Sequence, residues 1–157
     1  MRAVETWRCV TLASLLLWAL GCSPQPAAGP GEITWDRDTC EHCAMVIGER
    51  RYAAQLRDAR DGRLHFFDDL GCALLWLTAR AEAGEPASHH SELWVRDAQD
   101  EGWVDGFAAR YEGGRRTPMG YGFAASDAAA PRGFGFEELG TRLAAQESER
   151  RERGVRE

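Results

Sequence analysis

The sequence predicts a mixed α+β protein in which the order strand, strand, helix occurs twice along the chain. Short runs of β-branched and aromatic residues, bounded by turn signals, predict the strands. Two longer segments with acidic residues at their start predict the helices, because carboxylates there accept hydrogen bonds from free backbone N–H groups and favour the helix dipole. With 157 residues, the chain suffices for one ordinary domain or two very small ones.

The first 22 residues predict an export signal that is not part of the fold. Two arginines precede residues 9–20, an apolar stretch too short to cross about 30 Å of hydrocarbon as a helix. Residues 19–22 resemble the bacterial lipobox, whose cysteine is acylated and becomes the mature N-terminus, and Ser23 resembles the residue that follows it in outer-membrane lipoproteins. We therefore predict a lipid anchor at Cys22 on the periplasmic side of a bacterial membrane. A plain secretory signal is the alternative.

Residues 23–32 predict a flexible tether, because three prolines and two glycines prevent regular pairing and packing. Loss of residues 1–22 removes two arginines and one glutamate, which changes the formal net charge from −6 to −7. An acidic, exported chain is a poor candidate for a nucleic-acid-binding protein.

A first unit is predicted at residues 33–96. Residues 52–56 and 64–67 are predicted strands that flank an Asp61-Gly62 turn, so together they form a hairpin. A helix is predicted from Asp68 or Asp69 to about residue 83, and a further strand at 93–95.

A second unit is predicted at residues 97–146. Its strands are expected within 103–109 and 117–125, and its helix at 136–146, which has two glutamates in its first turn. Residues 147–157 are strongly charged and predict a helix end that frays into a disordered tail.

The most informative stretch is residues 39–47, where Cys40, Cys43 and Met45 lie within six residues. An extended backbone from Ala44 to Ile47 would place Cys43 and Met45 on one face, since strand side chains repeat every second residue. A thiolate beside a thioether is a ligand pair that suits Cu(I), because a soft ion prefers polarizable sulfur. The alternative for Met45 alone is core packing.

The remaining cysteine is Cys72, which lies in the apolar helix and is interpreted as a small buried hydrophobic residue. Without the leader, Cys40, Cys43 and Cys72 make an odd set, so at least one thiol is free, metal-bound or paired with another molecule. A disulfide between Cys40 and Cys43 is a further option for the metal-free protein.

Three other residues are candidates for completing a metal site. Met119 lies in a glycine-rich loop that permits close backbone approach, and it either binds Cu(I) or covers the core as a turn residue. His42 lies within the cysteine stretch. His65 lies on the hairpin beside two phenylalanines, where a structural role is the more common one.

These residues together resemble the NosL family, the accessory lipoproteins of nitrous oxide reductase. The resemblance spans residues 39–146 and is carried by the lipobox, the Cys40-x-x-Cys43-x-Met45 motif, the Phe-Phe-Asp end of the hairpin, and Met119-Gly120. It implies two small, similar ββαβ units and delivery of Cu(I) in the periplasm. It also implies Cys43 and Met45 as principal ligands and Met119 as a third. The chain has Glu41 and Ala44 where the family usually has Pro and Gly.

We therefore predict a membrane-anchored copper chaperone that is not an enzyme. Its ligands would be Cys43, Met45, Met119 and Cys40, and its partner an apo-cuproenzyme, nitrous oxide reductase being the one that the resemblance implies. Two alternatives remain: a thiol-disulfide module that uses Cys40 and Cys43, and a structural zinc domain. No pattern of nucleophile and base, phosphate loop or paired carboxylates stands out in the sequence.

Overall fold

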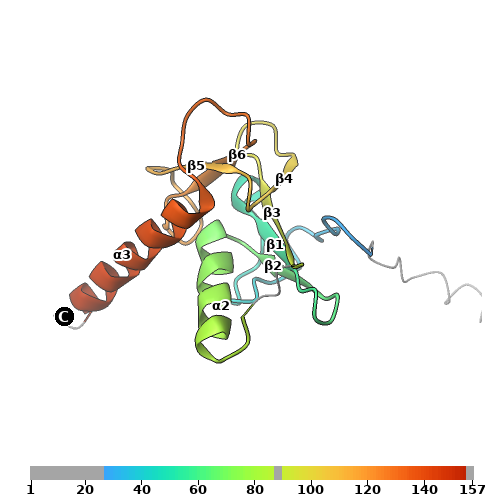
Figure 1. The fold of residues 1–157 in the computed structure, drawn as a ribbon, viewed down its shortest axis with the longest axis horizontal. Helices are drawn as coiled ribbons and strands as arrows, with labels where there is room; N and C mark the ends of the chain where they lie inside the picture. Colours follow the sequence, from blue (N-terminus) through green and yellow to red (C-terminus); the bar gives the residue numbers. More distant parts are fainter. Residues whose placement is uncertain (1–26, 87–89, 155–157) are drawn as a thin grey trace, which may run out of the picture.

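The computed structural model describes residues 27–86 and 90–154, and it confirms the α+β class. An antiparallel sheet has the strand order β2-β1-β3-β4, and β5 and β6 form a second, two-stranded sheet. Figure 1 shows these sheets with the helices α2 and α3 beside them. The strands are β1 (Ala54–Arg57), β2 (Leu64–Phe67), β3 (Glu92–Arg96), β4 (Trp103–Asp105), β5 (Arg110–Glu112) and β6 (Ala124–Ser126); the helices are η2 (Arg50–Tyr52), α2 (Leu70–Glu82) and α3 (Phe136–Gly154).

The predicted hairpin is confirmed. β1 pairs with β2 in antiparallel register, with Ala54 opposite Phe67 and Leu56 opposite His65. All four of these side chains are buried, so they form the inner face of the sheet. Because β3 pairs with the other edge of β1, β1 is an inner strand of the sheet, while β2 is an edge strand.

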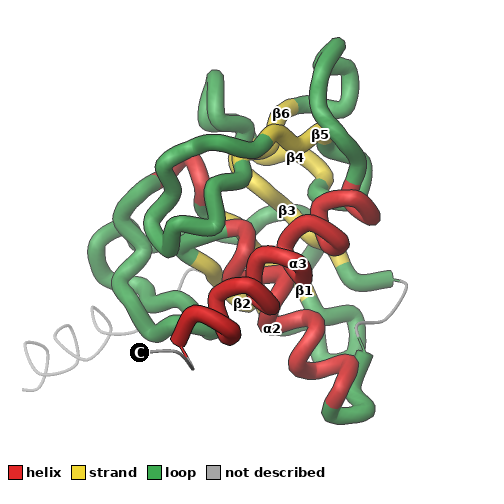
Figure 2. The backbone as a smooth tube through the Cα atoms, turned by 90° about the vertical axis from the view of Figure 1, so that its left-hand side faces the viewer, coloured by secondary structure: helices red, strands yellow, loops and turns green. Residues whose placement is uncertain are grey.

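The predicted helix α2 is also confirmed, with Asp69 as its N-cap. The Asp69 carboxylate accepts a hydrogen bond from the Gly71 N–H at 2.9 Å, which satisfies a backbone donor that the first turn leaves free. The helix packs on the inner face of the sheet, where Trp76 meets the Phe67 ring edge to face at 5.7 Å. Figure 2 shows α2 and α3 on the same side of the sheet.

The outer face of the sheet is covered by the segment that follows residue 27. Gly29 donates to Glu92 at 2.7 Å, and its carbonyl accepts from Arg57 at 3.0 Å. Gly31 exchanges two hydrogen bonds with the Gln55 side chain. Residues 27–32, part of the predicted tether, therefore pack against the strands, while the rest of that segment, the signal peptide and Cys22 lie outside the described residues.

The two similar ββαβ units are not confirmed. The order β1, β2, α2, β3 does form a ββαβ arrangement, but β4, from the predicted second unit, pairs with β3 and extends the same sheet. The second range continues as β5, β6 and α3, and no strand follows α3 within the described residues. β4 provides hydrogen-bond partners for the backbone groups along the free edge of β3. The main sheet therefore extends past the expected boundary at residue 96.

Both ranges also share one hydrophobic cluster, which extends from Ile33 to Leu143. The buried Asp97 links the two sheets, since its carboxylate accepts from the Asp127 N–H at 2.9 Å and from the Gln99 N–H at 2.8 Å. Next to it, the Ala98 N–H donates to the Ala125 carbonyl at 3.0 Å. Residues 27–86 and 90–154 therefore pack around a common core.

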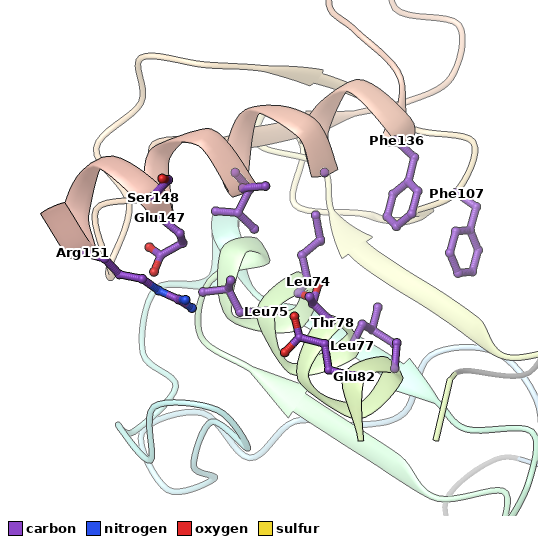
Figure 3. A pocket seen from close by; sticks show the side chains of 14 residues that line it. Leu74, Leu75, Leu77, Thr78, Glu82, Phe107, Phe136, Glu147, Ser148 and Arg151 are labelled. Atoms are coloured by element: carbon purple, nitrogen blue, oxygen red, sulfur yellow. The ribbon is translucent and has the colours of Figure 1, made fainter. Parts of the chain in front are cut away.

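Helix α3 continues to Gly154, well past the predicted end at residue 146. Ion pairs at helical spacing occur along its polar face, including Glu138 with Arg142 at 2.6 Å and Glu147 with Arg150 at 3.5 Å. Together α2 and α3 enclose an apolar groove of about 570 Å³ that contains none of the cysteines (Figure 3). Among the described residues, no helix combines the length and apolar character needed to cross a membrane.

One ion pair in the hairpin turn, between the buried Asp58 and the exposed Arg60, makes the stability of the fold depend on pH. Asp58 is almost fully buried and binds Arg60 at 2.5 Å, and this bond lowers the pKa of Asp58 from 3.8 to about 2. A carboxyl group whose pKa is lower in the folded than in the unfolded state stabilises the fold above the unfolded pKa. That contribution disappears as the pH falls through about 2.

We expect Asp58→Asn to lower the free energy of unfolding by about 1 kcal/mol at pH 7. The amide oxygen can still accept the Arg60 N–H, so the variant mainly loses the charge. The difference from the wild type should shrink as the pH drops from 4 toward 2 in urea titrations. Asp61→Asn is the control, because Asp61 is exposed and accepts only a local backbone hydrogen bond, so its effect should be close to zero.

Candidate metal centre

The cysteine stretch forms a tight turn. Thr39 and Val46 form an isolated antiparallel bridge, and the Cys40 N–H donates to the Met45 carbonyl at 2.8 Å. Ala44 has φ of +59°, in the left-handed region that glycine adopts more readily. The expected extended backbone from Ala44 to Ile47 is therefore wrong at its first residue, because the chain turns there to bring N–H groups toward the sulfur atoms.

Three cysteine sulfur atoms meet at this turn. The Sγ atoms of Cys40, Cys43 and Cys72 all lie within 4.8 Å of one another, and all three cysteines are free thiols. Cys40 and Cys72 are buried, while Cys43 is partly exposed. A metal ion about 2.3 Å from each of three sulfurs requires sulfur separations of about 4 Å, so this spacing is compatible with three-coordinate binding.

Backbone groups of the turn are arranged around the Cys40 sulfur. The Cys72 thiol donates to it, and so do the backbone N–H groups of Cys43, Asp68 and His42. The Cys72 thiol has the largest effect, and together these donors lower the pKa of Cys40 to about 5, although burial opposes the shift. These donors favour the thiolate form of Cys40, the form in which a cysteine binds a metal.

The other two sulfurs keep their protons when no metal is bound. The pKa of Cys72 is raised, first because its thiol donates to Cys40 and then by burial and the Cys40 charge. Burial also raises the pKa of Cys43, although the Met45 N–H donates to its sulfur. A soft cation that binds here would therefore displace the protons of Cys43 and Cys72 and be held by the deprotonated sulfurs.

Carboxylates next to the cysteines add negative charge. Burial raises the pKa of Asp68 to about 6, and the charges of Cys40 and Asp69 add to the shift. The pKa of Asp69 is raised as well, mainly by burial. Two acidic groups beside a thiolate favour a bound cation and disfavour an anion.

The two methionines differ in their exposure. About half of the Met45 side chain (51%) is exposed, so it does not share the half-buried position of Cys43. Met119 is half-buried against the core, and its N–H donates to Asp69 at 3.0 Å. This bond holds Met119 at the end of α2 that carries Cys72. The structure therefore brings Cys40 and Cys43 together, with Met45 beside them at the surface and Met119 at the helix start.

Neither histidine belongs to the cysteine cluster. His42 is exposed. His65 is buried against Trp76 at 4.5 Å, and its Nδ1 faces the Glu41 carboxylate at 3.5 Å. His65 does group with Asp58 and Asp61, but Arg60 already neutralises Asp58 there.

Cys72 is the residue that the sequence interpretation missed as a ligand candidate. Its apolar neighbours on α2 are typical of a buried helix position, and that much is correct, since it is fully buried. The available signal was the odd number of cysteines that remains if the predicted leader is removed. An unpaired third thiol in a chain with a predicted export signal is a reason to test whether it joins the other two.

No protein-family model matches the chain, and no curated protein does either. The resemblance to NosL therefore rests on the motifs quoted from the sequence.

The loop that carries Met119 depends on a glycine in α2. A Cβ at Gly71 would lie 2.3 Å from the Tyr121 ring, so only glycine lets this ring pack on the first turn of the helix. Arg150 covers the other side, stacking on Tyr121 at 4.6 Å and donating to the Gly120 carbonyl at 2.7 Å.

We expect Gly71→Ala to destabilise the protein by about 1–3 kcal/mol, because the new methyl group must displace Tyr121 and the Met119 loop. Gly140→Ala is the matched control, since Gly140 lies in α3 with open space at its Cβ. That control should stabilise the fold by up to about 1 kcal/mol through helix propensity. Thermal and urea unfolding would measure both, and equal effects would contradict the packing argument.

Proposed function

We propose that this protein is a copper carrier that binds Cu(I) through Cys40, Cys43 and Cys72 and passes it to a partner protein. The observation that carries the proposal is the convergence of three sulfurs within 4.8 Å around a cradle of backbone donors. Cu(I) is a soft cation that prefers thiolate ligands, and low coordination numbers suit its closed d shell.

Zinc fits this set of ligands less well. Structural zinc sites are closed by four ligands from cysteine, histidine or carboxylate side chains. Within residues 27–86 and 90–154, the group that includes the three cysteines contains no fourth residue of these types. A three-sulfur centre without a fourth donor favours Cu(I) over structural zinc.

The arrangement suits transfer of a metal ion better than permanent storage. Cys40 and Cys72 are buried, Cys43 is half-buried, and the Met45 thioether reaches the surface beside them. This gradient of solvent exposure gives a thiol or thioether of the partner protein access to one ligand at a time. We propose Met45 as a surface ligand for copper in transit and Met119 as a further ligand at the α2 end of the centre.

The cellular role proposed here rests on the sequence. A lipid anchor at Cys22 would hold the protein on the periplasmic side of a membrane, in the outer membrane if Ser23 directs sorting as expected. The resemblance to NosL suggests an apo-cuproenzyme as the recipient, nitrous oxide reductase in that family, and two similar ββαβ units belong to the same proposal. We propose a chaperone role and no enzymatic activity.

A thiol-disulfide module is the second candidate, favoured by the thiolate character of Cys40. Redox thiols must also be reached by their partners, whereas only 2% of Cys40 is exposed. This burial supports metal binding over exchange. The redox hypothesis predicts that Cys40→Ser abolishes activity while Met45→Leu has no effect.

We expect the reduced protein to bind one Cu(I) tightly, measured anaerobically against a chromophoric competitor chelator. Cys40→Ser, Cys43→Ser and Cys72→Ser should each weaken binding by more than about tenfold, because each removes a ligand. Met45→Leu should have a smaller effect on affinity and should slow transfer of copper to a competing thiol.

Two controls make this experiment decisive. Zn²⁺ in place of Cu(I) tests selectivity, and folding that resists zinc chelators would eliminate the structural zinc hypothesis. His42→Ala is the matched control for the turn, because His42 is an exposed side chain within it and should leave affinity unchanged. Unchanged Cu(I) binding in Cys72→Ser would contradict the three-sulfur centre. The remaining ligand candidates would then be Cys40, Cys43 and the two methionines.

A further inference from the structure

A second site lies on the outer face of the main sheet, at the end of β3. Arg96 extends there between two indole rings, 5.7 Å from the Trp35 centroid and 4.8 Å from the Trp103 centroid. Trp103 sits directly opposite Arg96 in the pairing of β3 with β4. Trp35 reaches the same place from the loop before the cysteine turn.

The Arg96 guanidinium is largely removed from water and makes no hydrogen bond to any residue that the structure describes. Only 14% of its side chain is exposed, and its Nε is buried without an acceptor. Its closest carboxylate is Glu101, whose oxygen lies 3.9 Å away, beyond hydrogen-bond distance. The buried Nε–H has no acceptor, and such an unpaired buried donor is energetically costly.

The surroundings of Arg96 compensate its charge only in part, through Glu101 at 3.9 Å. Arg50 stacks on the same Trp35 ring at 5.1 Å and adds a second positive charge. Burial lowers the pKa of Arg96, and the charge of Arg50 acts in the same direction, while the carboxylates of Glu101 and Asp100 oppose the shift. A ligand that brings a negative charge would relieve both the missing hydrogen bonds and the repulsion.

A cavity of about 470 Å³ opens beside Arg96. Its walls include both indole rings together with Ile33 and Pro30. Stacking between aromatic rings uses the faces of the guanidinium plane, so its edge remains available for hydrogen bonds in that plane. The cavity therefore combines a charged, planar donor with two indole rings in a lining that mixes polar and apolar groups.

We propose that this cavity binds a carboxylate carried by a flat or compact apolar group, as in an aromatic acid or the carboxyl end of a peptide. A carboxylate matches the fork of a guanidinium with two parallel hydrogen bonds. The apolar body would pack against the indole rings and Ile33. Glu32 also lines the cavity, and its carboxylate disfavours more highly charged anions such as phosphate. This site is separate from the cysteine centre.

The test uses benzoate as the probe and benzamide as its neutral isostere, added to the purified protein. The indole N–H signals of Trp35 and Trp103 in NMR spectra report binding, after assignment by single Trp→Phe substitutions. Benzoate should shift both signals in a saturable way, whereas benzamide should bind at least tenfold more weakly. Inorganic phosphate, as a separate probe, should also bind more weakly than benzoate.

Arg96→Gln should reduce benzoate affinity at least tenfold, because the charge and the fork are lost. Arg50→Gln is the matched control, since Arg50 also stacks on Trp35 but is exposed, and affinity should stay within about threefold. The comparison of benzoate with benzamide in the wild type tests the proposal even if Arg96→Gln fails to fold. Equal binding of benzoate and benzamide, or unchanged benzoate binding by Arg96→Gln, would overturn the proposal. Phosphate binding as strong as that of benzoate would contradict the claim that the ligand carries an apolar group.

Cu(I) affinity, measured on the same samples, keeps the two proposals apart. Arg96→Gln should bind Cu(I) like the wild type, and Cys72→Ser should bind benzoate like the wild type. Either site can therefore fail its test without affecting the conclusion about the other.

Discussion

The carboxylate of Asp69 joins the parts of the molecule on which the candidate metal centre depends. One of its oxygens caps α2 by accepting the Gly71 N–H, and the other accepts the Met119 N–H from a loop 50 residues further along the chain. Thr117 also bonds to this carboxylate. Because Cys72 lies in the first turn of α2, the same buried group determines where that sulfur and the Met119 loop lie relative to each other. These donors offset part of the cost of burying the Asp69 charge, and their loss would leave a buried charge unpaired.

The cysteine turn is held against this helix start by the hairpin. The Glu41 N–H donates to the Phe66 carbonyl at 2.9 Å, and the Asp68 N–H donates to the Cys40 sulfur, so the last residues of β2 and the turn position each other. Directed N–H groups in a buried place stabilise a thiolate in the way that backbone donors stabilise other anions. Backbone N–H groups therefore offset the cost of burying negative charge on the Cys40 sulfur. The left-handed conformation of Ala44 is part of the turn that presents these groups.

Much of the fold could be predicted from local patterns. The hairpin turn, the capped helix α2 and strand β3 follow from the Asp-Gly signal, the acidic residues before Leu70 and the short apolar run near Trp94, and all three are present. The pairing of β4 with β3 could not be predicted, because the pattern of a three-residue strand does not indicate its partner. The packing of residues 27–32 could not be predicted for a similar reason. Their glycines and prolines indicate a tether, yet Gly29 and Gly31 bond to side chains of the sheet that only the folded chain brings near.

For this protein the sequence alone determined the local elements, the acidic character of the chain and the cluster of soft ligands at Cys40, Cys43 and Met45. These features depend on residues close together in the chain, where turn chemistry, capping and side-chain type act directly. The tertiary structure decided that Cys72 joins that cluster, that Met45 lies at the surface, and that Arg96 lies between two tryptophans without an acceptor. Those facts follow from how α2 packs on the sheet and how β4 pairs with β3. Such long-range contacts are selected by burial of the whole core, and no short stretch of sequence contains the information that specifies them.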